Sequence, residues 1–459
     1  MDTKKLRQKI LDLAIRGKLV PQDPNDEPAS VLLERIRAEK EQLIKEGKIK
    51  RSKKSAASDT SHYENVPFEV PEGWAWCRLE DIAYVAAGST PSKESFVENG
   101  VPYIKMYNLR NQKIDFEFHP QYITEEVHNN KLARSRTQPG DLLMNIVGPP
   151  LGKLAIIPES LPEANFNQAA VLIRPFKFKP AITQYLFYYL SELSEINSIS
   201  TKGSAGQVNI SLTQSQQMRI ALPPLAELER ITQKIESLFS KIGVLETSID
   251  NIYAHISKIK SGILEKALSG KLVSQDKTEE PAITLLKSIN PDFEPTDNRH
   301  YENLPDSWEE VELGDVCQLF DGEKVRGKEF INLDVKYLRG SKDGSRLSSG
   351  KYVPENALMI LVDGENSGEV FTTPHEGYQG STFKQLRISS ELNRDYVLLL
   401  IQRSRELLKD NKVGSAIPHL NKKLFKQIHV PIPPYDEQSR IVRVVQDAMN
   451  KLDEILADL

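Results

Sequence analysis

The 459-residue sequence has few cysteines and only short apolar runs. Its two cysteines, Cys77 and Cys317, exclude a disulfide framework and a multi-cysteine zinc module, and two distant thiols suit a reducing compartment. The apolar runs, such as residues 357–362, are far shorter than the ~18 to 20 residues needed to span a bilayer. Residues 1–20 alternate charged residues with Leu and Ile, unlike a signal peptide. We therefore expect a cytoplasmic protein.

The sequence also lacks an excess of positive charge. It carries 60 Lys and Arg against 64 Asp and Glu, a formal net charge of −4. A surface that binds a polyanion must therefore be local. The length allows roughly three domains of about 150 residues each.

Catalytic signatures are missing as well. Ile432-Pro-Pro-Tyr435 is similar to the Asn-Pro-Pro-Tyr signature of amino-methyltransferases, but Ile replaces the residue that must bond the target amine. Residues 148–153 imitate a phosphate-binding loop, yet Leu154 replaces the Ser or Thr required at magnesium. The eight histidines show no metal-binding spacing. We expect no catalytic residue, no cofactor and no metal.

The chain contains internal repeats. Residues 10–36 align without a gap to 263–289, with 15 identities in 27 positions. Weaker pairs relate Pro71 and Trp74 to Pro305 and Trp308, and the segment from Pro223 to that from Pro433. Ordered along the chain, these pairs predict a circularly permuted repeat in which the two chain ends together supply one copy of the middle.

A heptad pattern of apolar residues follows Pro223-Pro224 and Pro433-Pro434. Apolar residues recur every three or four positions, which is typical of a left-handed coiled coil. Since a bare Ile and Leu stripe is rare on a soluble monomer, we expect the helices to pair antiparallel. The predicted coiled-coil residues are Leu228, Ile231, Ile235, Leu238, Ile242, Leu245, Ile249, Ile252, Ile256, Ile259, Ile263, Ile441, Val445, Leu452, Ile455 and Leu459. Gly17 and Gly270 are expected to cap the ends of helices.

Two globular segments break into short β-like runs separated by Gly, Pro and Asn, each followed by a helical stretch. The runs are VPYIKMY, DLLMNIVG, KLAIIP and AVLIRP in the first segment and VKYLRG, ALMILVDG, EVFTT and QLRIS in the second. The predicted fold class is α/β: two globular domains of mixed or antiparallel strands with flanking helices, separated by a long antiparallel two-helix coiled-coil spacer, in a circularly permuted pseudo-two-fold repeat.

These features give seven segments. The predicted boundaries are 1–47 for an N-terminal helical region that completes the second repeat, 48–62 for a basic linker, 63–222 for the first globular domain, 223–290 for the central helix, GKLV turn and short helix, 291–299 for a linker, 300–431 for the second globular domain and 432–459 for the C-terminal helix.

Basic residues cluster locally in predicted turns, beside Asn, Gln, Ser and Tyr. Arg and Lys can bond the major-groove acceptors of guanine, and Asn and Gln can bond adenine, so such loops suit base readout. The predicted DNA-binding residues are Ser89, Thr90, Lys105, Tyr107, Asn108, Arg110, Asn111, Arg134, Arg136, Lys153, Lys202, Gln207 and Asn209 in the first domain, and Lys324, Arg326, Lys328, Arg339, Ser341, Lys342, Arg346, Lys412, His419, Asn421 and Lys422 in the second.

The sequence closely resembles the DNA-specificity subunit of type I restriction-modification systems. The resemblance covers nearly the full chain and rests on GWAWCRLEDIA, SWEEVELGDVC, GSTPS, GSAGQVNIS, LPPLAELERI, IPPYDEQSRI and the paired GKLV turns. Leu228 stands where many relatives have Gln, as Gln438 does here. Residues 379–382 replace the Asn-Gln of 167–168, so loop contacts cannot be matched one for one between the domains.

The resemblance implies a non-catalytic subunit with two target-recognition domains, each reading half of a split site in double-stranded DNA. It also implies two methyltransferase subunits and restriction subunits as partners, with no membrane. An alternative left open by the residues is a coiled-coil scaffold whose globular ends bind proteins and read no DNA. Its duplex affinity would be absent or insensitive to salt.

Overall fold

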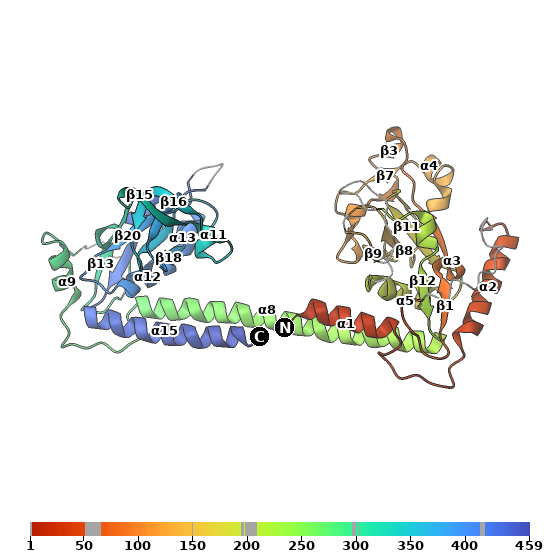
Figure 1. The fold of residues 1–459 in the computed structure, drawn as a ribbon, viewed down its shortest axis with the longest axis horizontal. Coiled ribbons are helices and arrows are strands. Elements are labelled where there is room, and N and C mark those ends of the chain that lie inside the picture. The colour runs from red at the N-terminus through yellow and green to blue at the C-terminus, as the bar shows by residue number, and fades with distance from the viewer. Residues whose placement is uncertain are drawn as a thin grey trace. The chain divides into compact units, whose positions relative to one another are not determined.

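The computed structural model describes residues 2–50, 66–148, 150–193, 197, 209–295, 300, 301, 303–413 and 418–459. Contacts divide the chain into a first unit, Met1–Thr247, and a second unit, Ser248–Leu459. Helix α8 (Leu225–Leu268) begins in the first unit and ends in the second (Figure 1). Its 44 residues match the helix predicted from the heptad pattern.

The first unit is a mixed α/β fold. Its helices are α1 (Thr3–Ile15), α2 (Ala29–Lys45), α3 (Leu79–Ile82), α4 (Glu125–Asn129), α5 (Lys179–Ser191), α7 (Leu212–Gln216) and the start of α8. Its strands are β1 (Ala75–Arg78), β2 (Ala83–Ala87), β3 (Phe96–Val97), β4 (Val101–Ile104), β5 (Leu109–Arg110), β6 (Lys113–Ile114), β7 (Tyr122–Ile123), β8 (Leu142–Asn145), β9 (Leu154–Ile156), β10 (Asn165–Phe166), β11 (Ala170–Pro175) and β12 (Arg219–Leu222).

The second unit repeats this plan. Its helices are the end of α8, α9 (Ala282–Ile289), α10 (Leu313–Val316), α11 (Val335–Leu338), α12 (Arg394–Arg403), α13 (Arg405–Asp410), α14 (Lys422–Lys426) and α15 (Tyr435–Ala457). Its strands are β13 (Glu309–Glu312), β14 (Cys317–Phe320), β15 (Lys324–Leu333), β16 (Arg346–Val353), β17 (Leu358–Leu361), β18 (Val370–Thr372), β19 (Gly377–Gln379), β20 (Phe383–Ile388) and β21 (His429–Ile432).

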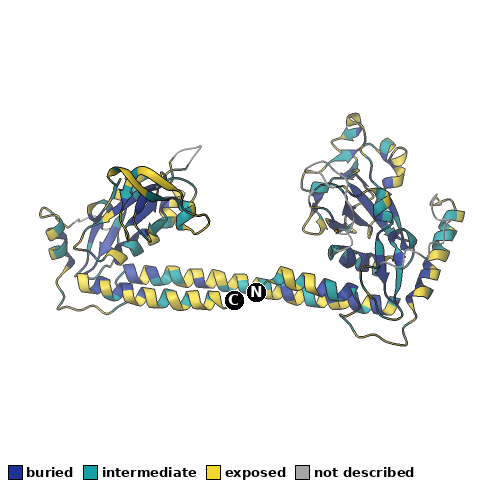
Figure 2. Cartoon of the chain, viewed as in Figure 1, coloured by how far each residue is buried: buried dark blue, intermediate teal, exposed yellow. Residues whose placement is uncertain are grey.

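Each unit is built on a four-stranded antiparallel sheet of the same strand order, β2-β11-β8-β9 in the first and β14-β20-β17-β18 in the second. Successive side chains of a strand point to opposite faces. Leu142 and Met144 of β8 accordingly belong to one apolar cluster and Leu143 to another. In β17, Ile360 belongs to one apolar cluster and its neighbour Met359 to another. Both faces of each sheet are therefore covered, as the buried residues in Figure 2 indicate.

The remaining strands make the fold mixed. In the first unit β10-β4-β7-β3 form a second sheet, in which β10 and β4 are parallel. In the second unit β15 and β16 form a long antiparallel ribbon that also pairs with β19. These pairings confirm the mixed and antiparallel strands predicted for both globular segments.

Each unit also contains a two-stranded antiparallel ribbon, β1-β12 in the first and β13-β21 in the second. We call the part of each unit around this ribbon its base. The Trp74 Nε1 atom donates a 2.9 Å hydrogen bond to Glu227 at the start of α8, and Gln22 donates one of 2.8 Å to the same carboxylate. Trp308 and Gln275 bond Glu437 of α15 in the same way, at 2.9 and 2.6 Å. We call each set of three residues a tryptophan anchor.

The GKLV turns lie beside the anchors. Gly17 and Gly270 have φ of +65° and +67° and follow the last residues of α1 and α8, which confirms the predicted caps. Residues 1–47 are predicted to complete the second repeat, and the described contacts of residues 2–47 lie in the first unit. The backbone N–H of Ala29, for example, donates to the carbonyl of Gly73 at 2.8 Å.

One predicted strand is wrong. VKYLRG was expected to be β-like, but residues 335–338 form the short helix α11. The Asp334 side chain accepts a hydrogen bond from the backbone N–H of Tyr337, which caps a helical turn. This local cap outweighs the preference of Val and Tyr for strands.

Candidate nucleic-acid interface

In the first unit, residues 105–119 present basic and aromatic side chains together. The guanidinium of Arg110 lies 3.9 Å from the centre of the Phe118 ring, and Tyr107 meets Phe118 edge to face. Phe118 is 38% exposed. The sequence prediction did not include this residue. Arg110 and Asn111 are exposed, and Lys105 is half-buried. Stacked Arg and aromatic groups at a surface suit contact with bases or phosphates.

Asn108 holds this loop in place and does not face solvent. Its side chain is 1% exposed and accepts from the N–H of Lys105 at 2.9 Å. Its amide donates to the carbonyls of Asp115 and Phe118 at 3.1 and 2.8 Å. The prediction that Asn108 reads a base is therefore corrected: its polar atoms close the loop.

A second group in the first unit surrounds Ser89. The Arg134 guanidinium donates to Ser89 Oγ at 3.4 Å, and the Tyr103 hydroxyl donates to the Ser89 carbonyl at 3.0 Å. Arg134 and Thr90 are exposed. Arg136 is occupied differently, because it donates to the side chain of Asn129 at 2.6 Å and to the carbonyl of His128 at 3.3 Å.

The other candidates of the first unit lie around β8. Lys153 and Asn209 are exposed. Val147 pairs with Asn209 in an isolated antiparallel bridge, and the Asn145 side chain accepts from the backbone N–H of Lys153. Lys202 and Gln207 lie outside the described residues.

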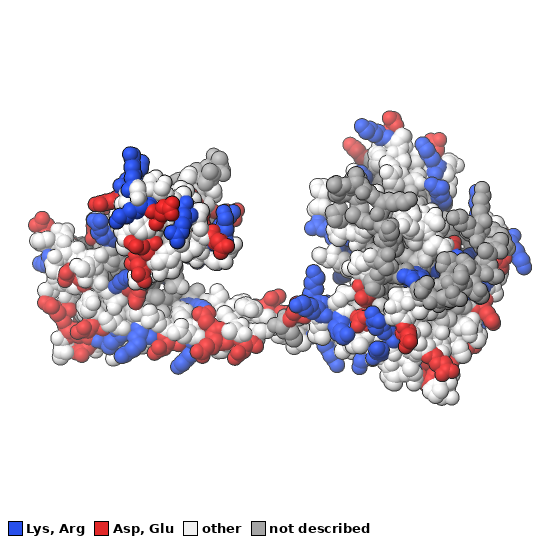
Figure 3. Space-filling model, viewed as in Figure 1, with Lys and Arg blue, Asp and Glu red and all other residues white. Residues whose placement is uncertain are grey.

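In the second unit the β15-β16 ribbon carries Lys324, Arg326, Lys328 and Arg346, and all four are exposed. Figure 3 shows Lys and Arg side chains over this part of the unit, interspersed with acidic ones. Leu347, which the prediction also missed, is 40% exposed beside Arg346. Such a ribbon can enter the major groove of B-DNA.

Asp321 anchors the base of the ribbon. Burial opposes its ionisation, but hydrogen bonds from Lys351, Lys384 and Gln379 hold the pKa of its carboxyl well below the usual range. The Lys351 ammonium lies 2.8 Å from the carboxylate and Gln379 donates to it at 2.9 Å. Asp321 is thus part of an ion-pair network that orients the ribbon.

Most of the remaining candidates of the second unit contact neighbouring groups. Arg339 pairs with Glu369, and the Ser341 hydroxyl donates to the Lys336 carbonyl at 2.9 Å. His419 Nδ1 lies 2.7 Å from an Asp363 oxygen. The Lys412 ammonium donates to the carbonyl of Glu365, and Lys342 and Lys422 are exposed.

Asn421 caps helix α14, because its side-chain oxygen accepts from the N–H of Leu424 at 3.0 Å. That oxygen is therefore engaged within the protein. The predicted base contact of Asn421 therefore stays a prediction, and the helix cap engages only its side-chain oxygen.

The heptad residues differ in exposure along the helices. Arg7 of α1 lies 2.8 Å from Glu246 of α8, and in the second unit Lys260 of α8 lies 2.5 Å from Asp453 of α15. The buried members are Leu228, Ile231, Ile235, Ile242, Ile256, Ile441 and Val445, and the half-buried ones are Leu238, Ile249, Ile252, Ile263, Leu452 and Leu459. Leu245, Ile259 and Ile455 are 46%, 50% and 51% exposed.

The two units form a two-domain protein of mixed α/β fold, and each carries basic side chains on exposed loops or strands. The chain belongs to the type I restriction modification DNA specificity domain family, whose model matches residues 71–254 and 305–458. This membership does not favour the alternative of a scaffold without DNA readout.

Two relatives from Escherichia coli match almost the whole chain. The EcoAI specificity subunit of a type I restriction enzyme is 27% identical over 99% of this chain and 89% of its own length. The EcoEI specificity subunit is 26% identical over 99% and 90%. A solved structure from a study of complex assembly in the type I R-M system has a TM-score of 0.58 at 17% identity, covering 85% of this chain and 94% of that chain. It supports the fold. None of the helices in the described part of the chain is long and apolar enough to cross a membrane.

Proposed function

We propose that the chain is the non-catalytic, DNA-reading subunit of a type I restriction-modification complex. Residues 63–222 and 300–431 act as target-recognition domains, and each reads one half of a bipartite site in double-stranded DNA. The observation that carries this proposal is the exposed β15-β16 ribbon with Lys324, Arg326, Lys328 and Arg346. The family is described as a DNA specificity domain, which supports a polyanionic partner for these basic side chains.

The first domain uses a different surface for the same task. Its loop 105–119 offers Arg110, Tyr107 and the exposed Phe118, and the separate group around Ser89 offers the exposed Arg134. Because the loop and the ribbon differ in shape and residues, the two domains read different base sequences.

The helices separate the readers and bind the partner enzymes. We propose that α8 pairs antiparallel with α1 and α15 as a coiled-coil spacer, and that the permuted repeat brings the chain ends together. This spacer docks two methyltransferase subunits and, with them, restriction subunits, in the cytoplasm. Support comes from the apolar heptad positions and from the relatives, which are named as specificity subunits of type I restriction enzymes.

The DNA interface is tested by replacing Lys324, Arg326 and Arg346 with Ala and measuring duplex affinity in the assembled methyltransferase. We expect a loss of about 10- to 100-fold, and a salt dependence that weakens by about one unit of slope per phosphate contact removed. A matched variant, Lys277→Ala with Lys287→Ala, removes exposed lysines of the same unit outside the ribbon. Equal affinity and salt slope for the ribbon variant and wild type would contradict the proposal.

The spacer is tested by its length. Deleting one heptad between Leu228 and Ile263, with the matching heptad of the partner helices, removes about 10.5 Å of helical rise. At 3.4 Å per base pair, the unspecified gap of the target then shortens by up to about three base pairs. Methylome sequencing that finds the original gap would contradict a spacer role.

A further inference from the structure

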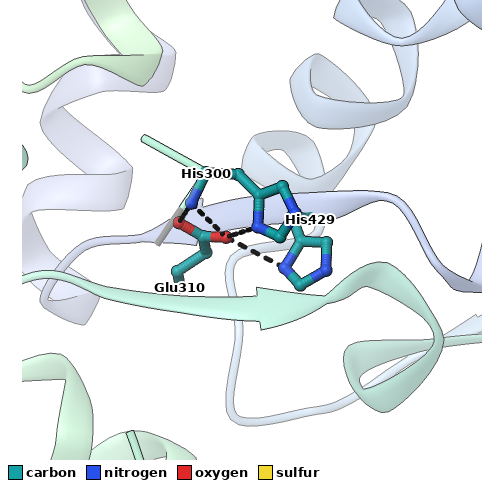
Figure 4. A group of neighbouring side chains, drawn as sticks. All are labelled: His300, Glu310 and His429. Atoms are coloured by element: carbon teal, nitrogen blue, oxygen red, sulfur yellow. Dashed lines mark hydrogen bonds and ion pairs between the residues drawn. The ribbon is translucent and has the colours of Figure 1, made fainter. Parts of the chain in front are cut away.

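Three side chains at the base of the second unit form a compact group of possible metal ligands. His300 lies in the segment that leads into the domain, Glu310 is on β13 and His429 begins β21 (Figure 4). The ligand atoms of these three residues all lie within 4.8 Å of one another. We propose that they bind one Zn²⁺ ion.

The carboxylate of Glu310 lies at the centre of the group. Its Oε1 atom is 2.9 Å from Nδ1 of His300 and 2.9 Å from Nδ1 of His429. A tetrahedral zinc ion with bonds of about 2.0 to 2.2 Å separates its ligand atoms by about 3.3 Å. Each of the two observed separations therefore needs to widen by only a few tenths of an ångström to admit the ion.

The protein holds the Glu310 carboxylate in this orientation. Its side chain is 1% exposed, although Glu310 carries a charged group. The backbone N–H of His300 donates to both oxygens, at 3.1 and 2.9 Å, and that of Tyr301 donates to Oε2 at 3.1 Å. Such outer hydrogen bonds orient a metal-binding carboxylate and compensate part of its burial.

Without a bound ion, the contacts of the two imidazole rings leave one buried nitrogen without a hydrogen bond in the described part of the chain. They stack with their centres 3.7 Å apart and their planes 24° from parallel. Nδ1 of His300 hydrogen-bonds to the carboxylate, but Nδ1 of His429 is buried and makes no hydrogen bond to any described residue, despite its 2.9 Å distance from Glu310. Buried polar atoms are normally paired, and a metal ion would pair this one.

The donor set favours a transition-metal ion such as Zn²⁺ over a hard cation. Two imidazole nitrogens and one carboxylate oxygen suit Zn²⁺, whereas Mg²⁺ and Ca²⁺ prefer oxygen ligands. The His300 side chain is 53% exposed, so a water molecule has access to a fourth position. Three protein ligands with one water are a common zinc arrangement.

The site is confined to the second unit. Trp76 and Arg219 occupy the strand positions in the first unit that Glu310 and His429 occupy in the second, since the registers Arg78 to Arg219 and Glu312 to His429 correspond. Neither Trp nor Arg binds zinc in this way. One ion per chain is therefore expected, and it joins the entering segment to the β13-β21 ribbon.

The test is titration of the metal-free full chain with ZnCl₂, followed by calorimetry and by hydrogen exchange of peptides from the two ribbons. We expect one Zn²⁺ per chain, with protection increasing in β13 and β21 but not in β1 and β12. His300→Gln, a change at a half-exposed side chain, should weaken binding by about 100-fold or more while the chain still folds. MgCl₂ should not reproduce the effect.

His419→Gln is the matched control, because it removes a half-exposed histidine of the same unit that also pairs with a carboxylate, that of Asp363. Its zinc binding should equal that of wild type. X-ray absorption of the zinc-loaded chain should find two imidazoles on the metal, and the absence of imidazole ligation would overturn the proposal. So would zinc binding that is absent from wild type or unchanged in His300→Gln.

Discussion

The bases of the two units hold the same elements together with partly different chemistry. Both contain a tryptophan anchor, in which Trp74 or Trp308 bonds a glutamate at the start of a long helix. Beside the anchor, the first unit places Phe68 on Trp76, with ring centres 5.1 Å apart. The second unit places the stacked rings of His300 and His429 against Glu310.

The comparison indicates that the fold requires the tryptophan anchor and tolerates different contacts beside it. The anchor joins the strand that enters the domain to the helix that leaves it, and its donors and acceptor are the same in both units. The neighbouring contact only has to cover one face of the ribbon, which an aromatic pair or a polar group can do. We expect equivalent substitutions in the two tryptophan anchors to have equal effects, whereas substitutions beside the anchors should differ between the units.

The largest effect is expected at the shared glycines. A Cβ atom at Gly17 or Gly270 would lie 2.4 Å from Cγ of Pro71 or Pro305, at a positive φ. Gly17→Ala and Gly270→Ala should each lower the free energy of unfolding by about 2 to 4 kcal/mol, from backbone strain and overlap together. Urea unfolding of the full chain measures this loss.

Gly47→Ala is the control for strain alone, since Gly47 has a φ of +71° but nothing within 4 Å of the added Cβ. It should cost only about 1 kcal/mol. Equal losses for Gly47 and Gly17 would show that the contact with Pro71 contributes little.

The next effect concerns the anchor glutamates. Glu227→Ala or Glu437→Ala leaves a buried Trp Nε1 without its acceptor and should cost about 1 to 3 kcal/mol in the affected unit. Hydrogen exchange of ribbon peptides should locate each loss to its own unit, β1-β12 or β13-β21. Glu229→Ala, at an exposed position of α8, should change protection in neither. Losses of protection that differ strongly between the units would contradict the equivalence of the two tryptophan anchors.

The smallest effect is a pH dependence. Burial raises the pKa of Glu227 and of Glu437 above the ordinary 4.5, although hydrogen bonds from the Trp and Gln of each anchor limit the rise. The folded chain therefore binds these protons more readily than the unfolded chain. Their contribution to the free energy of unfolding increases as the pH falls through the raised pKa toward 4.5, and is lowest above it.

Comparing wild type with Glu437→Gln in urea at pH 7 and pH 5 isolates this contribution, because Gln does not titrate. Wild type should gain stability relative to the variant at the lower pH, and Glu227→Gln should behave alike. A relative loss on acidification would contradict burial as the dominant cause of the shift.

The sequence predicted the elements with strong patterns. The heptads of residues 225–268 specify a helix whatever surrounds it, and the apolar rhythm shared by 139–153 and 354–368 appears as the equivalent strands β8 and β17. VKYLRG was mispredicted because the cap at Asp334 is a local contact that strand preference does not reveal.

The candidate site was harder to predict, mainly because the sequence does not show which way a side chain points. Asn108 has the residue type for base readout, but folding turns its polar atoms to backbone groups a few positions away, and in Asn421 the side-chain oxygen alone is engaged in this way. The group of His300, Glu310 and His429 was missed because its members come from three separate stretches of chain. The register of β13 with β21 brings Glu310 and His429 together, and hydrogen bonds from His300 to Glu310 add the third residue.

The central claim is that the two domains read DNA independently. The most direct measurement exchanges residues 63–222 for the corresponding domain of a relative, expresses the chimera with its methyltransferase subunit, and sequences the methylome at single-molecule resolution. We expect a new sequence in one half of the target, with the other half unchanged. Methylation at a target altered in both halves would contradict it.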